Sequence, residues 1–188
     1  MLKMNYWTDK WDLHEDICPC DVHFNDWTDA QEIRGKTIFH FGTGTHHVVG
    51  VKQAEKGNLV YGITASVEEY EVYIKLVTEN AKVAKNYLAY FGDIYLTNPR
   101  LLPEFDVVTM FHLCEFFFPN TASAEYGGMT DRQMLDLFTE KTRAGGYLLF
   151  YPRSIAWDRA QAVVAQWEKE RPVERVGEFK TLLVYRKR

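Results

Sequence analysis

The sequence has no apolar run that approaches the ~20 residues a membrane-spanning helix needs. Its first segment, MLKMNYWTDKWD, is polar and aromatic and lacks the apolar core of a signal peptide. We therefore expect no membrane partner. Because no targeting signal is evident, we expect a cytoplasmic location.

Cysteine is also scarce, with only Cys18, Cys20 and Cys114 in the chain. An odd number without a secretory signal argues against a disulfide framework, and a ring closed across Cys18-Pro19-Cys20 would be strained. Basic residues do not gather into a run of five or more, and the net charge is −4. Because nucleic-acid binding needs a basic surface, nucleic acid is disfavoured as the partner. An oligomer is compatible with the sequence.

Apolar residues, by contrast, make up 46% of the 188 residues and aromatic residues 15%. This is enough for one domain with a sizeable core. Residues 1–34 lack a clean hydrophobic period, and we expect them to form an N-terminal cap or lid. Residues 35–188 alternate regularly, and we expect a single α/β domain there.

Strand and helix patterns follow one another through this second part. Short apolar runs predict strands at residues 37–41, 59–63, 87–91, 105–111, 147–151, 173–176 and 181–186. Amphipathic stretches predict helices at residues 46–56, 67–83, 130–142 and 157–170. Strict alternation is typical of a doubly wound, mostly parallel sheet with helices on both faces. The last two of the seven strands read as an antiparallel hairpin.

Ligands bind such sheets outside the carboxyl ends of the strands. The most informative strand end is HFGTG, residues 40–44, where an apolar strand meets a glycine-rich corner. Glycine there lets the chain turn tightly and lets a ligand approach the backbone. The strand ends at 64–66, 92–93 and 112–115 should converge on the same crevice. The sequence thus predicts a nucleotide-type ligand site.

The order of these motifs over residues 36–188 resembles the class I S-adenosylmethionine-dependent methyltransferases. HFGTGTH stands where that family has an acidic residue followed by Gly-x-Gly-x-Gly, and YGIT stands at the end of its second strand. FGDI matches its Gly-Asp after the third strand, while FDVVTMFHLCEF and AGGYLLFYPRS match its fourth and fifth strands. The resemblance implies a Rossmann-like fold, S-adenosylmethionine as cofactor, and methyl transfer to a small molecule.

The resemblance assigns the cofactor site to His40, Gly42, Gly44, Thr64 and Asp93. Asp93 would accept a hydrogen bond from the adenine amino group. His40 and Thr64 replace the two acids that hold the cofactor's ammonium group and its ribose hydroxyls. Their presence leaves a second hypothesis open, in which a non-catalytic or repurposed protein of this fold binds another metabolite or a protein partner.

Two acids near the second predicted strand bear on this replacement. Glu68 or Glu69 could reach the ribose. For Glu69 the simpler interpretation is a capping box, because it stands three residues after Ser66 at a predicted helix start.

The resemblance places the substrate beside the loop after the fourth strand. His112 is our candidate catalytic residue, as a general base for the nucleophile that receives the methyl group. Glu115 would orient His112 or bind a cationic substrate. From the cap, we expect Trp11 and His14 to contact the substrate. Cys114 is interpreted as a small buried apolar group.

Two imidazoles and two thiols lie within ten residues of the cap, at His14, Cys18, Cys20 and His23. Zinc favours four such ligands, but a single proline between the cysteines is an atypical spacing for it. We therefore predict no metal and interpret the segment as a lid with a cysteine pair. The sequence leaves the metal alternative open.

Overall fold

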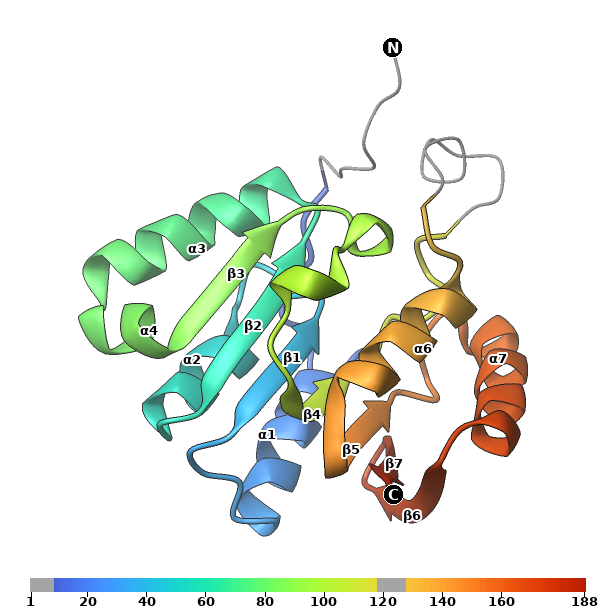
Figure 1. Ribbon diagram of the computed structural model, residues 1–188. Coiled ribbons are helices and arrows are strands. Elements are labelled where there is room, and N and C mark those ends of the chain that lie inside the picture. The colour runs from blue at the N-terminus through green and yellow to red at the C-terminus, as the bar shows by residue number, and fades with distance from the viewer. Residues whose placement is uncertain (1–8, 118–127) are drawn as a thin grey trace.

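The structure, a computed structural model, describes residues 9–117 and 128–188, with a seven-stranded sheet at its centre (Figure 1). The strands follow the order β3-β2-β1-β4-β5-β7-β6. Their bounds are β1 (Thr37–Phe41), β2 (Leu59–Thr64), β3 (Tyr87–Phe91), β4 (Phe105–Thr109), β5 (Thr142–Phe150), β6 (Val173–Phe179) and β7 (Leu182–Lys187). The first five strands run parallel, and β7 is antiparallel to β5 and β6. The predicted α/β class, seven strands and closing hairpin are confirmed.

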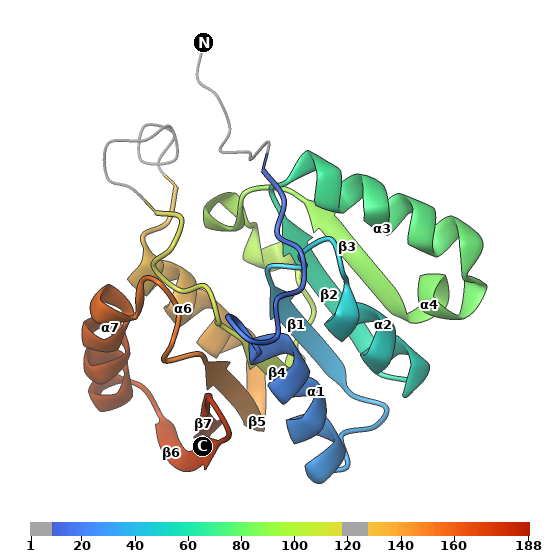
Figure 2. The same cartoon turned by 180° about the vertical axis from the view of Figure 1, so that it is seen from behind.

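Helices cover both faces of this sheet, as predicted. Their bounds are α1 (Cys20–Ala30), α2 (Val48–Glu55), α3 (Val67–Glu79), α4 (Ala81–Asn86), α6 (Asp131–Lys141) and α7 (Trp157–Glu170), with short 3-10 turns η1 (Ile94–Leu96) and η2 (Pro99–Leu101). Figure 1 shows α6 and α7 on one face, and Figure 2 shows α1 and α2 on the other. Among the described residues, no helix is long and apolar enough to cross a membrane.

The alternation of side chains along β1 divides the core between these two layers. Phe39 points to the face that holds Phe138 of α6, and the two rings stack with centroids 4.0 Å apart. Ile38 points to the opposite face and joins a cluster that contains Phe24 of α1. Because both faces of β1 are buried, the strand shows no polar alternation in the sequence.

Several element boundaries differ from the predicted ones, and the largest differences are at the end of the helix predicted over residues 67–83 and at the start of β5. The helix expected over residues 67–83 is interrupted at Asn80, whose side-chain oxygen accepts hydrogen bonds from the Lys82 and Val83 N–H groups, both at 3.2 Å. Such local bonds compete with helix continuation. Strand β5 begins at Thr142, ahead of the glycines expected to precede it. A register shift between Phe105 and Val107 of β4 accommodates the extra residues.

Helix α1 is a finding that the sequence did not predict. Its Phe24 and Trp27 are 0% and 3% exposed, so this part of the expected cap belongs to the core. The buried face also carries polar residues, which conceals the hydrophobic period. Gln53 Nε2 of α2 donates to Asn25 Oδ1 and to Thr28 Oγ1, both at 2.7 Å, and these bonds satisfy the buried polar groups.

His47 links α2, α3 and β3 through a buried ring. Its Nε2–H donates to the Glu69 carbonyl oxygen at 2.8 Å, so Nδ1 is the acceptor of the Tyr87 hydroxyl at 2.9 Å. The backbone of His47 is left-handed, with φ 44°, as it enters α2. Burial lowers the pKa of His47 to about 4, so the ring is neutral in the folded protein.

This neutral histidine makes the protein sensitive to acid. Between about pH 6.5 and about pH 4 the unfolded chain binds a proton at His47 that the folded chain does not. The free energy of unfolding therefore has its full value above this range. It decreases as pH falls through the range, by up to about 3 kcal/mol from His47 alone. Denaturant unfolding across this range should show a shallower pH dependence for His47→Gln than for the wild type. His14→Gln, at an exposed position, is the control and should keep the wild-type slope.

Candidate functional site

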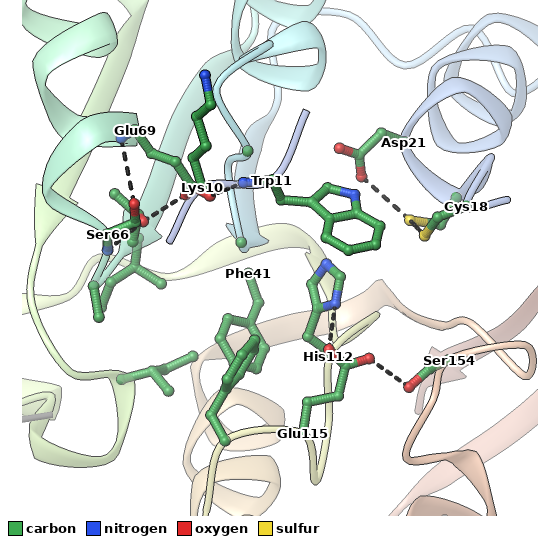
Figure 3. Close-up of a pocket in the computed structure, with 18 of the residues that line it drawn as sticks. Lys10, Trp11, Cys18, Asp21, Phe41, Ser66, Glu69, His112, Glu115 and Ser154 are labelled. Atoms are coloured by element: carbon green, nitrogen blue, oxygen red, sulfur yellow. Dashed lines mark hydrogen bonds and ion pairs between the residues drawn. The ribbon is translucent and has the colours of Figure 1, made fainter. Parts of the chain in front are cut away.

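A cavity of about 330 Å³ opens at the carboxyl ends of the parallel strands (Figure 3). Gly42, Thr64, Asp93 and His112 all line it, and they stand at or just after the carboxyl ends of four different strands. The predicted convergence of these strand ends is confirmed. The cavity includes the point where the strand order reverses, between β1 and β4, which is the usual ligand position in open α/β sheets.

The glycine-rich corner after β1 keeps the cavity floor free of side chains. Gly42 and Gly44 have positive φ, at 84° and 55°. A Cβ on Gly42 would lie 2.7 Å from Cδ2 of His112, and a Cβ on Gly44 would collide with the His46 ring. Only glycine therefore satisfies both the backbone conformation and the space at these positions.

His40 lies behind this floor rather than in the cavity. It is 1% exposed and is not among the lining residues. Its Nδ1 is 2.9 Å from the Thr109 hydroxyl, and its Nε2 is 3.6 Å from Oδ1 of Asp21. The side chain that reaches the cavity near this position is the Asp21 carboxylate, from the first turn of α1.

Asp21 is a functional candidate that the sequence reasoning missed. Burial raises the pKa of its carboxyl, but His40 and His46 outweigh this effect and the net shift is downward, so the carboxylate is ionised. Its contacts to the two imidazoles are 3.6 and 3.7 Å long, beyond ordinary hydrogen-bond lengths. The sequence did contain a signal for this helix, because a proline followed closely by an acid, as in Pro19-Cys20-Asp21, favours a helix start.

Glu69 supplies a second buried carboxylate to the cavity. The Thr64 hydroxyl donates to Oε2 at 2.6 Å and the Thr43 hydroxyl donates to the same oxygen at 3.3 Å. The Trp11 N–H donates to Oε1 at 3.2 Å. Thr64 therefore lines the cavity but also holds an acid there, from the first turn of α3.

Only half of the expected capping box forms at the start of α3. Ser66 Oγ accepts from the Glu69 N–H at 3.5 Å, as predicted. The Ser66 N–H, however, donates to Thr64 Oγ1 at 3.0 Å instead of to the Glu69 side chain. The Glu69 carboxylate is thus released from capping and turned into the cavity.

Asp93, which follows β3, also lines the cavity. Its Oδ1 accepts from the Tyr95 N–H at 2.9 Å and so begins the 3-10 turn η1. This bond fixes the orientation of the carboxylate at the cavity wall.

Part of the predicted cap crosses the mouth of the cavity. The Asp9 carbonyl accepts from the Ser66 hydroxyl at 2.8 Å, and the Trp11 carbonyl accepts from the Thr45 N–H at 2.8 Å. Figure 3 shows the Trp11 indole and the His112 ring among the side chains that line the cavity. Trp11 lines the cavity, whereas His14 does not and instead packs edge-on against Trp11 with centroids 6.1 Å apart.

His112 and Glu115 form a pair on the other side of the cavity. His112 Nδ1 donates to Glu115 Oε2 at 3.0 Å, and the Ser154 hydroxyl donates to Oε1 at 2.6 Å. Burial lowers the pKa of His112, but the bond to Glu115 and its charge dominate and raise it to about 9. The ring is therefore protonated at neutral pH, whereas a general base needs it unprotonated. Glu115 orients His112 through this bond, one of its two expected roles.

The four candidate metal ligands of the cap do not share one site. Cys18 and Cys20 lie with their sulfurs 3.5 Å apart, while His23 Nδ1 is bonded to the Thr181 hydroxyl at 2.7 Å. Within residues 9–117 and 128–188, no group of three or more His, Cys, Asp or Glu side chains has a geometry that could hold a metal ion. Cys114 is buried, and burial raises the pKa of its thiol to about 12.

Comparison with known proteins identifies the fold through structure alone. No protein-family model matches the sequence, and no curated protein matches it significantly. Among solved structures, magnesium protoporphyrin IX methyltransferase from Synechocystis, with bound S-adenosylmethionine, superposes with a TM-score of 0.59 at 15% identity, over 90% of this chain and 79% of that one. The chain has the fold of the class I S-adenosylmethionine-dependent methyltransferases.

Other structures with this fold belong to methyltransferases of different kinds. A TehB-like methyltransferase from Corynebacterium glutamicum has a TM-score of 0.60 at 15% identity and covers 88% of each chain. A 16S rRNA methyltransferase from Thermus thermophilus, solved with AdoMet and guanosine, has a TM-score of 0.54 at 15% identity over 92% of this chain and 44% of that one. The class I methyltransferase fold therefore leaves the substrate type to be argued from the cavity.

The protonation of His112 is directly measurable. NMR titration of the wild type should give a pKa of about 9 for this imidazole. In Glu115→Gln the favourable charge is lost while burial remains, so the pKa should fall to about 6.5 or below. Glu104→Gln, at an exposed acid, should leave the His112 titration unchanged. An unchanged His112 pKa in Glu115→Gln would contradict the pairing.

Proposed function

We propose that this protein is an S-adenosylmethionine-dependent methyltransferase that acts on a small molecule. The observation that carries the proposal is the presence of two buried carboxylates in the cavity, Asp21 and Glu69, which contact His40 and Thr64, the residues that stand where the resemblance gives the family its acids. The two substitutions therefore do not remove negative charge from the cavity.

Asp21 fits the ammonium group of the cofactor. Its carboxylate is ionised, it lines the cavity, and its distance of 3.6 Å from His40 Nε2 places it beside the position of the missing acid. A charge-assisted bond to an ammonium group contributes about 1–3 kcal/mol. His40 then supports Asp21 from behind instead of contacting the cofactor.

Glu69 and Asp93 fit the remaining polar parts of the cofactor. A carboxylate has about four acceptor sites, and protein donors fill three of those on Glu69, so one remains for a ribose hydroxyl. Asp93, which also lines the cavity, would accept a hydrogen bond from the adenine amino group. The glycine corner at Gly42 and Gly44 would let the cofactor lie against the backbone.

When bound, S-adenosylmethionine supplies a methyl group activated by its positively charged sulfur. The chain's own contribution is to position the acceptor and to limit water. Trp11 covers the cavity mouth, held by the bonds of its backbone to Glu69 and Thr45. His112 is protonated and would donate a hydrogen bond to the acceptor, with Glu115 fixing the plane of its ring.

A small-molecule acceptor accords with the size and charge of the protein. The cavity volume of about 330 Å³ lies near the lower end of ordinary ligand pockets, roughly 300–1,000 Å³. The net charge is −4 and the chain has no basic run of the kind that follows nucleic-acid phosphates. A cytoplasmic location remains an expectation from the sequence.

Cofactor binding tests the proposal without requiring the acceptor. S-adenosylhomocysteine should raise the melting temperature of the wild type, because a ligand that binds only the folded state stabilises it. Titration calorimetry should show that Asp21→Asn and Glu69→Gln each bind S-adenosylhomocysteine at least about tenfold more weakly than the wild type. The reason is that each variant loses about 1–3 kcal/mol of binding free energy.

Matched controls lie on the same two helices. Asp26→Asn on α1 and Glu71→Gln on α3 carry the same changes outside the cavity and should bind like the wild type. If the wild type shows no melting shift with millimolar S-adenosylhomocysteine, the alternative of a repurposed protein that binds another metabolite or a protein partner is favoured. Equal weakening by variants and controls would refute the assignment of Asp21 and Glu69.

A further inference from the structure

Two cysteine sulfurs lie at the substrate side of the cavity, and the proposed methyl transfer uses neither. Cys18 and Cys20 both line the cavity, with their sulfurs 3.5 Å apart (Figure 3). Their burial differs, because Cys18 is partly exposed and Cys20 is 2% exposed. This difference assigns the two thiols different chemical states.

Cys20 is the protonated member of the pair. Its hydrogen bond with Cys18, its burial and the adjacent Asp21 charge all raise the pKa of its thiol well above the ordinary value. The Cys20 S–H faces two acceptors, Asp21 Oδ1 at 3.6 Å and the Cys18 sulfur at 3.5 Å, and the contact to Cys18 is the shorter of the two. The same bond is the largest influence on Cys18 and, opposed by partial burial, lowers its pKa to about 7.

The groups around Cys18 come from three parts of the chain. Cys20 and Asp21 belong to α1, His112 follows β4, and Tyr151 follows β5. The protonated His112 favours a negative charge on Cys18, and the Asp21 carboxylate opposes it with a smaller effect. Burial raises the pKa of Tyr151, so this hydroxyl stays neutral. One neutral thiol donor and one cation thus face the Cys18 sulfur.

We propose that Cys18 is a nucleophilic thiolate site that captures soft, uncharged carbon electrophiles entering the cavity. The thiolate, held by the Cys20 donor, opens onto a cavity whose lining also includes Ile17 and Ile155, at 65% and 94% exposure. An apolar opening admits uncharged compounds more readily than anions. The site acts without S-adenosylmethionine and so does not depend on the proposed function.

Iodoacetamide is a suitable probe, because its reaction is a simple displacement. The Cys18 sulfur attacks the CH₂ carbon, the new C–S bond forms as the C–I bond breaks, and iodide leaves with the bonding electrons. The reacting form is the Cys18 thiolate, so no proton moves in this step, and Cys20 keeps its own proton. The product is a carbamidomethyl thioether on Cys18.

The experiment measures the alkylation rate of each cysteine in the folded wild type from about pH 5 to about pH 10, with peptide mass spectrometry to locate the adduct. Cys18 should react with a midpoint near pH 7, against about 8.5 for an ordinary thiol. Cys20 and Cys114 are internal comparisons and should stay unmodified at neutral pH. A Cys18 midpoint at or above about 8.5, or faster reaction of either buried cysteine, overturns the proposal.

Variants at Cys20 test the origin of the reactivity. Cys20→Ala removes the donor and should move the Cys18 midpoint upward by about one pH unit or more, towards the ordinary value. Cys20→Ser keeps a donor and should stay closer to the wild type, while Cys114→Ser should leave the midpoint unchanged. The midpoint is the chosen readout because a thiolate of higher pKa is also more nucleophilic, which masks part of the change in rate. An unchanged midpoint in a folded Cys20→Ala protein refutes the role of Cys20. If that variant does not fold, the pH profile of Cys18 alkylation in the wild type tests the proposal instead.

Discussion

The parallel pairing of β1 with both β2 and β4 is the constraint on which the site depends. The register aligns His40 with Gly62 of β2 and with Thr109 of β4, so the three strands end at one edge of the sheet. Their following segments must then turn out over that edge, on opposite sides of β1. This places the glycine corner at Gly42 between the second-strand loop and His112. The position of the cavity therefore follows from the strand order alone and does not depend on its side chains.

The carboxylates show how a fold can keep the charge of a site while changing the residues that supply it. A carboxylate at the end of β1 or β2 would come from the strand itself, whereas Asp21 and Glu69 come from the first turns of two helices. Each is connected to the residue that replaced the strand acid, Asp21 to His40 and Glu69 to Thr64. His40 and Thr64 contact these acids instead of supplying one, so a motif comparison confined to the strands underestimates the negative charge of the cavity.

The sequence predicts those features that are determined by residues within one element, and it does not predict those that depend on residues distant in the sequence. Strands such as β1 and β3 were predicted within their observed bounds, because a buried parallel strand must be apolar along its whole length. Helix α1 was missed because Asn25 and Thr28 on its buried face are satisfied by Gln53, a residue distant in sequence. The direction of Glu69 was equally hidden, because its choice between capping and the cavity is made by Thr43 and other residues outside its own helix.

The ionised groups of the cavity share one electrostatic arrangement. Each has a partner on the protein side: Glu115 beside His112, His40 beside Asp21, and the Cys20 thiol beside Cys18. Packing fixes each partner in place, so each group is already held in its charged state before a ligand binds. The carboxylates of Asp21 and Glu69 come from α1 and α3, and the imidazolium of His112, paired with Glu115, comes from the loop after β4. A ligand with a cationic end and a separate hydrogen-bond acceptor would match this polarity, and the sulfonium cofactor with its acceptor molecule is such a combination.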